Sequence, residues 1–174
     1  MSRRHVAVVL TVAVVAGVVI AGVVIPSSAE EPPPPIAAEV LAGRAVFTDD
    51  VALKVKLSTD GATDVVKTKD PSGTVTARFT VQPGAQFPWH THAGPVFVNV
   101  VQGTLVYVDG DTCDHRAYPA GTAFVDLGHG DVHTAFNPGP GETVIVATFF
   151  EVPASGDLVI PTDAPAGCTI SSRT

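Results

Sequence analysis

Three histidines and the residues between them constrain this chain more than any other feature. His90 and His92 are separated by one residue, and His133 follows much later in the chain. In a β-strand the side chains at positions i and i+2 point to the same face, so His90 and His92 converge while Thr91 turns away. His133 can join them only if the sheet folds back on itself. The spacing therefore predicts a small closed β-structure that brings three imidazoles together.

Alternating apolar residues predict short strands in the rest of the chain. In 51–57 and 75–81 every second residue is apolar. The run 96–101 is apolar on both faces apart from Asn99, which predicts a strand covered on both sides. Further strands are expected at 104–108 and 143–152. No segment after the N-terminal region has helical periodicity, so an all-β sandwich or barrel is expected.

The residues that flank the histidines follow two spaced motifs. The first is matched by Gly84, His90, His92 and Gly103, and the second by Gly130, His133 and Asn137. In this spacing the chain resembles the cupin superfamily, as a small single-domain secreted member. The resemblance implies an all-β cupin jelly-roll barrel (a double-stranded β-helix) with a metal site inside. It also implies that Asn137 satisfies backbone groups at the barrel edge.

The chain departs from the cupin pattern at one metal ligand. The family site uses the His-x-His pair, a glutamate and a later histidine, and the glutamate position here is Val96. Three neutral imidazoles would leave a divalent metal its charge of +2, whereas a carboxylate ligand would reduce it to +1. Such a centre is expected to be more Lewis-acidic and to attract an anionic ligand. It is also expected to bind the metal more weakly.

The resemblance implies that His90, His92 and His133 hold one divalent transition metal. The sequence leaves its identity open among Fe, Mn, Ni, Cu and Zn. His129, in a turn between two glycines, is an alternative fourth ligand or pocket base, although such a turn favours exposure to solvent. Asp131 is an alternative replacement for the missing carboxylate.

An apolar pocket is expected around the histidines. Its predicted walls are Val96, Val98 and Phe87, joined by Phe124, Phe136 or Phe149. A mostly apolar wall around a polar centre suits a small-molecule ligand, which the charge of the metal would favour as an anion. Three classes remain open: a metal-dependent enzyme, a non-catalytic ligand-binding module, and a metal-free structural barrel. A homodimer is a further expectation for this fold.

The charge of the chain argues against nucleic acid as a partner. Lys and Arg number 10 against 17 Asp and Glu, a net charge of −7. Arg3 and Arg4 lie in the N-terminal region, and without them 8 basic residues face 17 acidic ones, a net charge of −9. No basic patch interrupts this excess, so polyphosphate binding is not expected.

The N-terminus reads as a targeting segment. Two arginines precede the uncharged run 6–25, and small residues before position 30 fit a signal-peptidase site. We expect a signal peptide at 1–29, a proline-rich linker at 30–39, and the barrel with a C-terminal tail at 40–174. The run 6–25 is also long enough for an uncleaved membrane anchor. Either alternative places residues 30–174 outside the cytoplasm, because the arginines stay inside.

The chain has two cysteines, Cys113 and Cys168. An oxidising compartment favours a disulfide between them, and such a bond would tie the C-terminal tail to the barrel. Two free thiols are the alternative.

Overall fold

The computed structural model describes residues 35–58, 63–168 and 170. Every described residue belongs to one compact unit, Pro33–Thr174. The predicted signal peptide 1–29, including the run 6–25, lies outside the described residues. Within the described ranges, no helix is long and apolar enough to cross a membrane.

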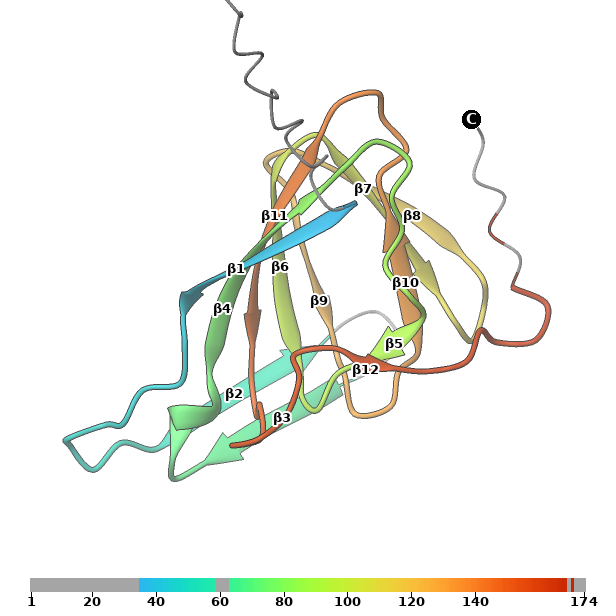
Figure 1. Ribbon diagram of the computed structural model, residues 1–174. Coiled ribbons are helices and arrows are strands. Elements are labelled where there is room, and N and C mark those ends of the chain that lie inside the picture. Colours follow the sequence, from blue (N-terminus) through green and yellow to red (C-terminus); the bar gives the residue numbers. More distant parts are fainter. Residues whose placement is uncertain (1–34, 59–62, 169, 171–174) are drawn as a thin grey trace, which may run out of the picture. The chain divides into compact units, whose positions relative to one another are not determined.

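Two five-stranded antiparallel sheets form the barrel (Figure 1). The first has the order β1 (Ile36–Ala42), β4 (Val75–Val81), β11 (Thr143–Phe149), β6 (Val96–Gln102) and β9 (Ala123–Asp126). The second has the order β12 (Ile160–Pro161), β5 (His90–Thr91), β10 (His133–Phe136), β7 (Thr104–Asp109) and β8 (His115–Pro119). A hairpin of β2 (Leu53–Ser58) and β3 (Thr63–Thr68) and one 3-10 turn at Pro71–Gly73 complete the described part. The predicted all-β jelly-roll class is confirmed.

The core lies between the inner faces of the central strands. β4 and β11 bury every second residue, and Ala77 of β4 lies directly opposite Ala147 of β11. The ring of Phe79 meets the rings of Phe87 and Phe149 edge to face, at centroid distances of 5.7 and 6.2 Å. Such aromatic pairs add stability beyond their buried area. Phe87 and Phe149 in turn contact the rings of His90 and His92, at centroid distances of 6.0 and 5.3 Å.

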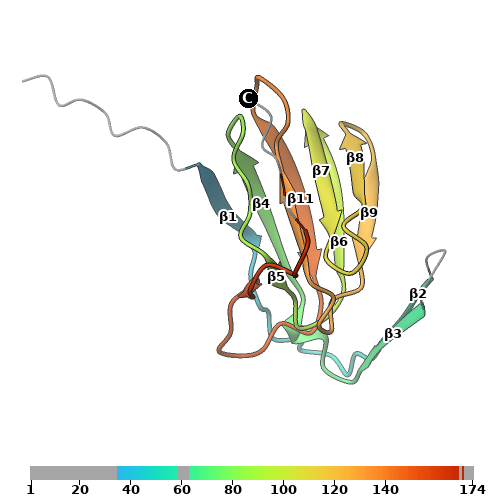
Figure 2. The same cartoon turned by 90° about the vertical axis from the view of Figure 1, so that its right-hand side faces the viewer.

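The first sheet begins earlier than the sequence predicts. Residues 36–42, the end of the expected linker 30–39 and the start of the expected barrel, form β1, which pairs with β4 from Ile36 opposite Val81 (Figure 2). β1 is an edge strand, and most of its residues are exposed. A strand that buries so little has no clear apolar alternation, so the sequence does not distinguish it from an extended linker.

The prediction that β6 is covered on both faces was wrong. Val96, Val98 and Val100 are buried, but Val101 is 59% exposed. The outer face of β6 is therefore partly open to solvent. Apolar residues on both faces of a strand do not by themselves imply a second covering layer, because much of a protein's surface is apolar.

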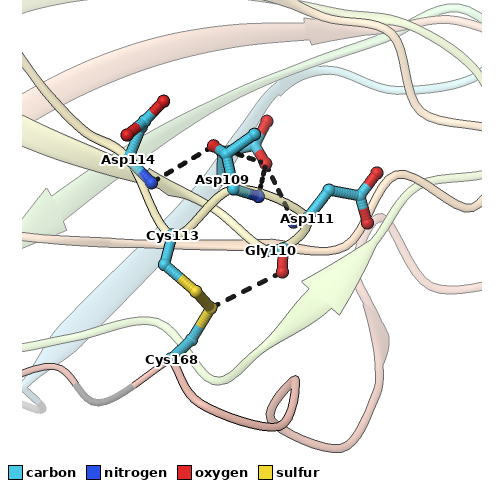
Figure 3. The surroundings of a disulfide bond; sticks show 7 residues. Asp109, Gly110, Asp111, Cys113, Asp114 and Cys168 are labelled. Atoms are coloured by element: carbon cyan, nitrogen blue, oxygen red, sulfur yellow. Dashed lines mark hydrogen bonds between the residues drawn. A yellow bond between two sulfur atoms is a disulfide. The ribbon is translucent and has the colours of Figure 1, made fainter.

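The predicted disulfide is present between Cys113 and Cys168 (Figure 3). The two Cα atoms are 5.4 Å apart and 55 positions apart in sequence. Cys113 lies in the tight loop between β7 and β8, in which the Asp109 carboxylate accepts hydrogen bonds from the backbone N–H groups of Asp111 and Thr112. The bond thus joins the C-terminal tail to an ordered turn of the second sheet.

Replacing both cysteines, as Cys113→Ser with Cys168→Ser, is expected to lower the free energy of unfolding by about 4 kcal/mol. The reason is that a long closed loop no longer restricts the unfolded chain. Urea denaturation with and without a dithiol reductant measures the change. The reductant should bring the wild type down to the double variant and leave the double variant unaffected. Equal stability under all four conditions would contradict the prediction.

Candidate metal centre

The fold brings the three predicted histidines together at one end of the cavity between the sheets. His90 of β5 is the direct antiparallel partner of His133 of β10, and His92 follows β5. The ring centroids of His90 and His133 are 4.2 Å apart. The ring centroid of His92 is 4.9 Å from that of His90 and 5.1 Å from that of His133. All three side chains are buried, and one ring nitrogen from each lies within 4.8 Å of the others.

Backbone carbonyl groups determine the tautomers of His90 and His92. The Nδ1 atom of His90 is 2.7 Å from the oxygen of Pro88, and that of His92 is 2.7 Å from the oxygen of Leu158. A carbonyl oxygen only accepts, so each Nδ1 carries a proton and the neutral ring has its lone pair on Nε2. Burial lowers the pKa of His90 to about 3, aided by the charge of His133, and burial also lowers the pKa of His92. Both rings are therefore neutral at pH 7.

A buried carboxylate, Asp126, orients the third ring. Its Oδ2 atom lies 3.0 Å from Nδ1 of His133 and accepts a hydrogen bond from the Tyr107 hydroxyl at 2.9 Å. Its Oδ1 atom accepts the backbone N–H of Gly128 at 2.8 Å. Burial acts to raise the pKa of Asp126, but the hydrogen bonds from His133 and Tyr107 and the electrostatic effect of His133 and His92 together lower it. An ionised Asp126 holds the proton of His133 on Nδ1 and leaves its Nε2 free.

Asp126 is a site residue that the sequence motifs do not reveal. A single aspartate before a glycine-rich turn resembles an ordinary turn residue. The signal that could have found it is its place opposite Val96, which depends on the pairing of β6 with β9. That pairing is a tertiary contact that the sequence does not display.

The three rings fit a divalent transition metal. Across the ranges that the structure describes, no hydrogen bond engages Nε2 of His90, His92 or His133. Metal-bound histidines are typically arranged in this way, with the second ring N–H held by a carbonyl or a carboxylate. A divalent cation would find one ring nitrogen from each of the three histidines already oriented.

The cavity beside the rings is small and mostly apolar. Its volume is about 40 Å³, and a single water needs about 10–15 Å³ on the same measure, so it has room for only a few water-sized groups. The expected walls Val96, Val98 and Phe87 line it, together with Phe124 and Phe149. Phe136 lies elsewhere, with its ring 6.1 Å from that of the exposed His115.

The two alternative ligands lie outside this cluster. His129 is at the surface, where its Nε2 is 2.9 Å from Oε2 of Glu151 and its Nδ1 is 3.5 Å from Oδ2 of Asp64. Asp131 is exposed, and only its backbone oxygen approaches Nδ1 of His133, at 3.4 Å. The turn places both side chains away from the cavity. His129 is thus not positioned as a fourth ligand, and Asp131 does not replace the missing carboxylate.

A glycine allows the turn after Asp126 to pack against the histidine segment. Gly128 has a positive φ of 64°, and a Cβ atom there would lie 2.2 Å from the oxygen of Gly94. The next residue donates its backbone N–H to the oxygen of His92 at 3.0 Å. Any side chain at position 128 would push these segments apart. The glycine, which stands where the cupin motif usually has proline, therefore couples the turn to the site.

The C-terminal tail from residue 153 to 168, which we term the strap, lies along β5. β12, within it, pairs with β5, with Ile160 opposite Thr91 and Pro161 opposite His90. Leu158 supplies the carbonyl that orients His92, and Val159 lines the cavity. The disulfide fastens the far end of the strap. The second sheet therefore depends on the strap for one of its histidine orientations.

Comparisons with known proteins agree with this architecture. The sequence profile of the ChrR cupin-like domain matches residues 44–149, more than half of the chain. A search of the curated proteins finds no match.

Among solved structures, the chain matches an oxalate oxidase in complex with the substrate analogue glycolate. It is 28% identical over 44% of this chain and 41% of its own, with a TM-score of 0.41. A cupin-like protein from Thermotoga maritima is 23% identical over 46% of this chain and 59% of its own, with a TM-score of 0.42. KdgF from Halomonas sp. is 18% identical over 69% of this chain and 83% of its own, with a TM-score of 0.45. The chain spans about two fifths of the oxalate oxidase chain.

The metal-free protein is expected to lose stability in acid because of His90. Its pKa is about 3 in the folded chain and 6.5 without the fold, so the unfolded chain binds an extra proton between these values. The stabilisation is present above pH 6.5 and is lost as the pH falls toward 3, by up to about 1.4 kcal/mol per pH unit. Urea denaturation of chelator-treated protein between pH 4 and 7 should show a smaller slope for His90→Gln than for the wild type. Parallel slopes would contradict this assignment.

Proposed function

The chain belongs to the ChrR cupin-like family, and from this premise we propose that it is an extracytoplasmic domain that binds one divalent transition metal through His90, His92 and His133. The observation that carries the proposal is the position of each Nδ1 atom. Each Nδ1 faces an acceptor, so three Nε2 lone pairs are left for one ion. A bound divalent cation would supply Lewis acidity to a ligand in the cavity.

We further propose that the ligand is a small anion. Three neutral imidazoles bring no charged ligand to the ion, so a coordination position is left for an anion, and the cavity of about 40 Å³ has room for a small one. Its apolar walls offer few partners for the many hydroxyl groups of a sugar. A carboxylate or thiolate on a small apolar body fits both the charge and the walls better.

The proposed location outside the cytoplasm is supported by the disulfide. Bonds such as Cys113–Cys168 persist in oxidising compartments and are rare in the cytosol. The targeting segment expected at 1–29 agrees with export. Detection of the protein in the exported fraction, with the leader removed or retained, would test the proposal and separate secretion from anchoring.

A metal-free barrel is the second candidate, and one observation favours it. Val96 is buried and apolar where the cupin pattern has a carboxylate ligand, and the loss of that ligand weakens a metal site. In that case the domain would serve as a ligand-binding or structural module. Elemental analysis of the exported protein, purified without chelator, distinguishes the two candidates. About one transition metal per chain supports the first, and none after incubation with each metal supports the second.

Each of the variants His90→Ala, His92→Ala and His133→Ala is expected to lower metal affinity by at least about tenfold, since each removes one of three donors. Inductively coupled plasma mass spectrometry after dialysis against a limiting metal buffer measures the change. The matched control is His115→Ala, an exposed histidine in β8. Equal metal content in all four variants would contradict the proposed ligands.

Small carboxylates or thiolates should raise the midpoint temperature of thermal unfolding of the metal-loaded protein. Neutral sugars should leave the midpoint unchanged, because they lack the charge and do not fit the cavity. The stabilisation should disappear in His133→Ala and after removal of the metal. A response to sugars alone, or the same anion response without metal, would contradict the anion proposal.

A further inference from the structure

The position of the missing carboxylate has an acidic residue directly opposite it. Val96 on β6 pairs with Asp126 on β9, and both side chains line the cavity. Directly opposed residues of paired strands present their side chains to the same face. Val96 is 1% exposed and Asp126 is 3% exposed. A negative charge therefore lies at the same level of the barrel as the cupin glutamate, on the neighbouring strand.

Three donors from different elements hold this carboxylate. They are Nδ1 of His133 on β10, the hydroxyl of Tyr107 on β7, and the backbone N–H of Gly128 in the turn after β9. The ring of Tyr107 also stacks on that of His133, at a centroid distance of 4.9 Å and an interplanar angle of 21°. Tyr107 thus contacts both members of the pair. The carboxylate of Asp126 is therefore held beside His133 and is buried from solvent.

We propose that Asp126 supplies, from outside the ligand set, the negative charge that position 96 lacks. This inference rests on the proposed metal site. Through the hydrogen bond from Nδ1 of His133, Asp126 makes Nε2 of that ring a stronger electron-pair donor to the metal and holds the ring in place. It also offsets one positive charge of the ion without occupying a coordination position. The site then combines the overall charge of a cupin centre with one more position open to a small ligand.

The test uses Co²⁺ and azide as probes on the full exported protein. Asp126→Asn keeps the shape of the side chain but removes its charge. The amide group of the variant then faces the donors whose hydrogen bonds the carboxylate accepted. Co²⁺ affinity, measured from the visible spectrum, is expected to fall about 10–100-fold. Azide affinity of the Co²⁺-loaded variant is expected to rise, because the centre becomes more positive. The matched control Asp114→Asn makes the same change at an exposed position away from the cavity and should leave azide affinity unchanged.

A second variant moves the charge to the position used by other cupins. In Val96→Glu with Asp126→Asn, the carboxylate returns to the cavity from β6. Co²⁺ affinity should recover to within about tenfold of the wild type, and azide affinity should fall back to the wild-type value or below. A residue that only stabilises the fold would not be rescued in this way. If Asp126→Asn does not fold, the double variant is compared directly with the wild type, and a folded double variant that fails to bind Co²⁺ overturns the inference.

The outcomes separate this inference from the proposed function. Wild-type binding that is lost in His133→Ala but unchanged in Asp126→Asn overturns the inference and leaves the metal site standing. Weak binding in Asp126→Asn without recovery in the folded double variant also overturns it, since Asp126 then has a structural role. Absence of Co²⁺ binding in the wild type overturns the proposed function itself. Opposite changes in Co²⁺ and azide affinity, followed by recovery, support both.

Discussion

The antiparallel pairing of β5 with β10 is the contact on which the candidate site depends. It places His90 directly opposite His133, and the step of two residues to His92 brings the third ring to the same face. β5 has only two residues and cannot form a stable edge alone. β10 on one side and β12 on the other hold it in the second sheet. The site is therefore a product of sheet closure, and its parts are far apart until the barrel forms.

Hydrogen bonds to the Nδ1 atoms orient the three rings. Each histidine uses Nδ1 toward an acceptor, and each acceptor comes from a different part of the chain. Leu158 belongs to the strap, which the disulfide fastens to the loop between β7 and β8. Asp126 belongs to a turn that Gly128 allows to pack closely against the histidine segment. The strap and the turn thus determine ring orientation, although neither contains a metal-ligating side chain.

The distribution of charge distinguishes this barrel from the usual cupin arrangement. An apolar residue occupies the ligand position on β6, while an ionised carboxylate is buried one strand away. Burying a charge is costly unless donors surround it, and Asp126 has three. A charge held behind a ring acts on an ion at longer range than a ligand does.

The sequence by itself determined the strands of the core and the three histidines, because period-two burial and the spacing of His90 and His92 are local properties. The matched glycines pointed to the cupin barrel, and the two cysteines could be paired because no others exist. β1 could not be predicted, since an exposed edge strand leaves no pattern. Asp126 could not be predicted either. Its role arises from the alignment of β9 with β6 and from contacts with Tyr107 and His133, which only the closed barrel brings together.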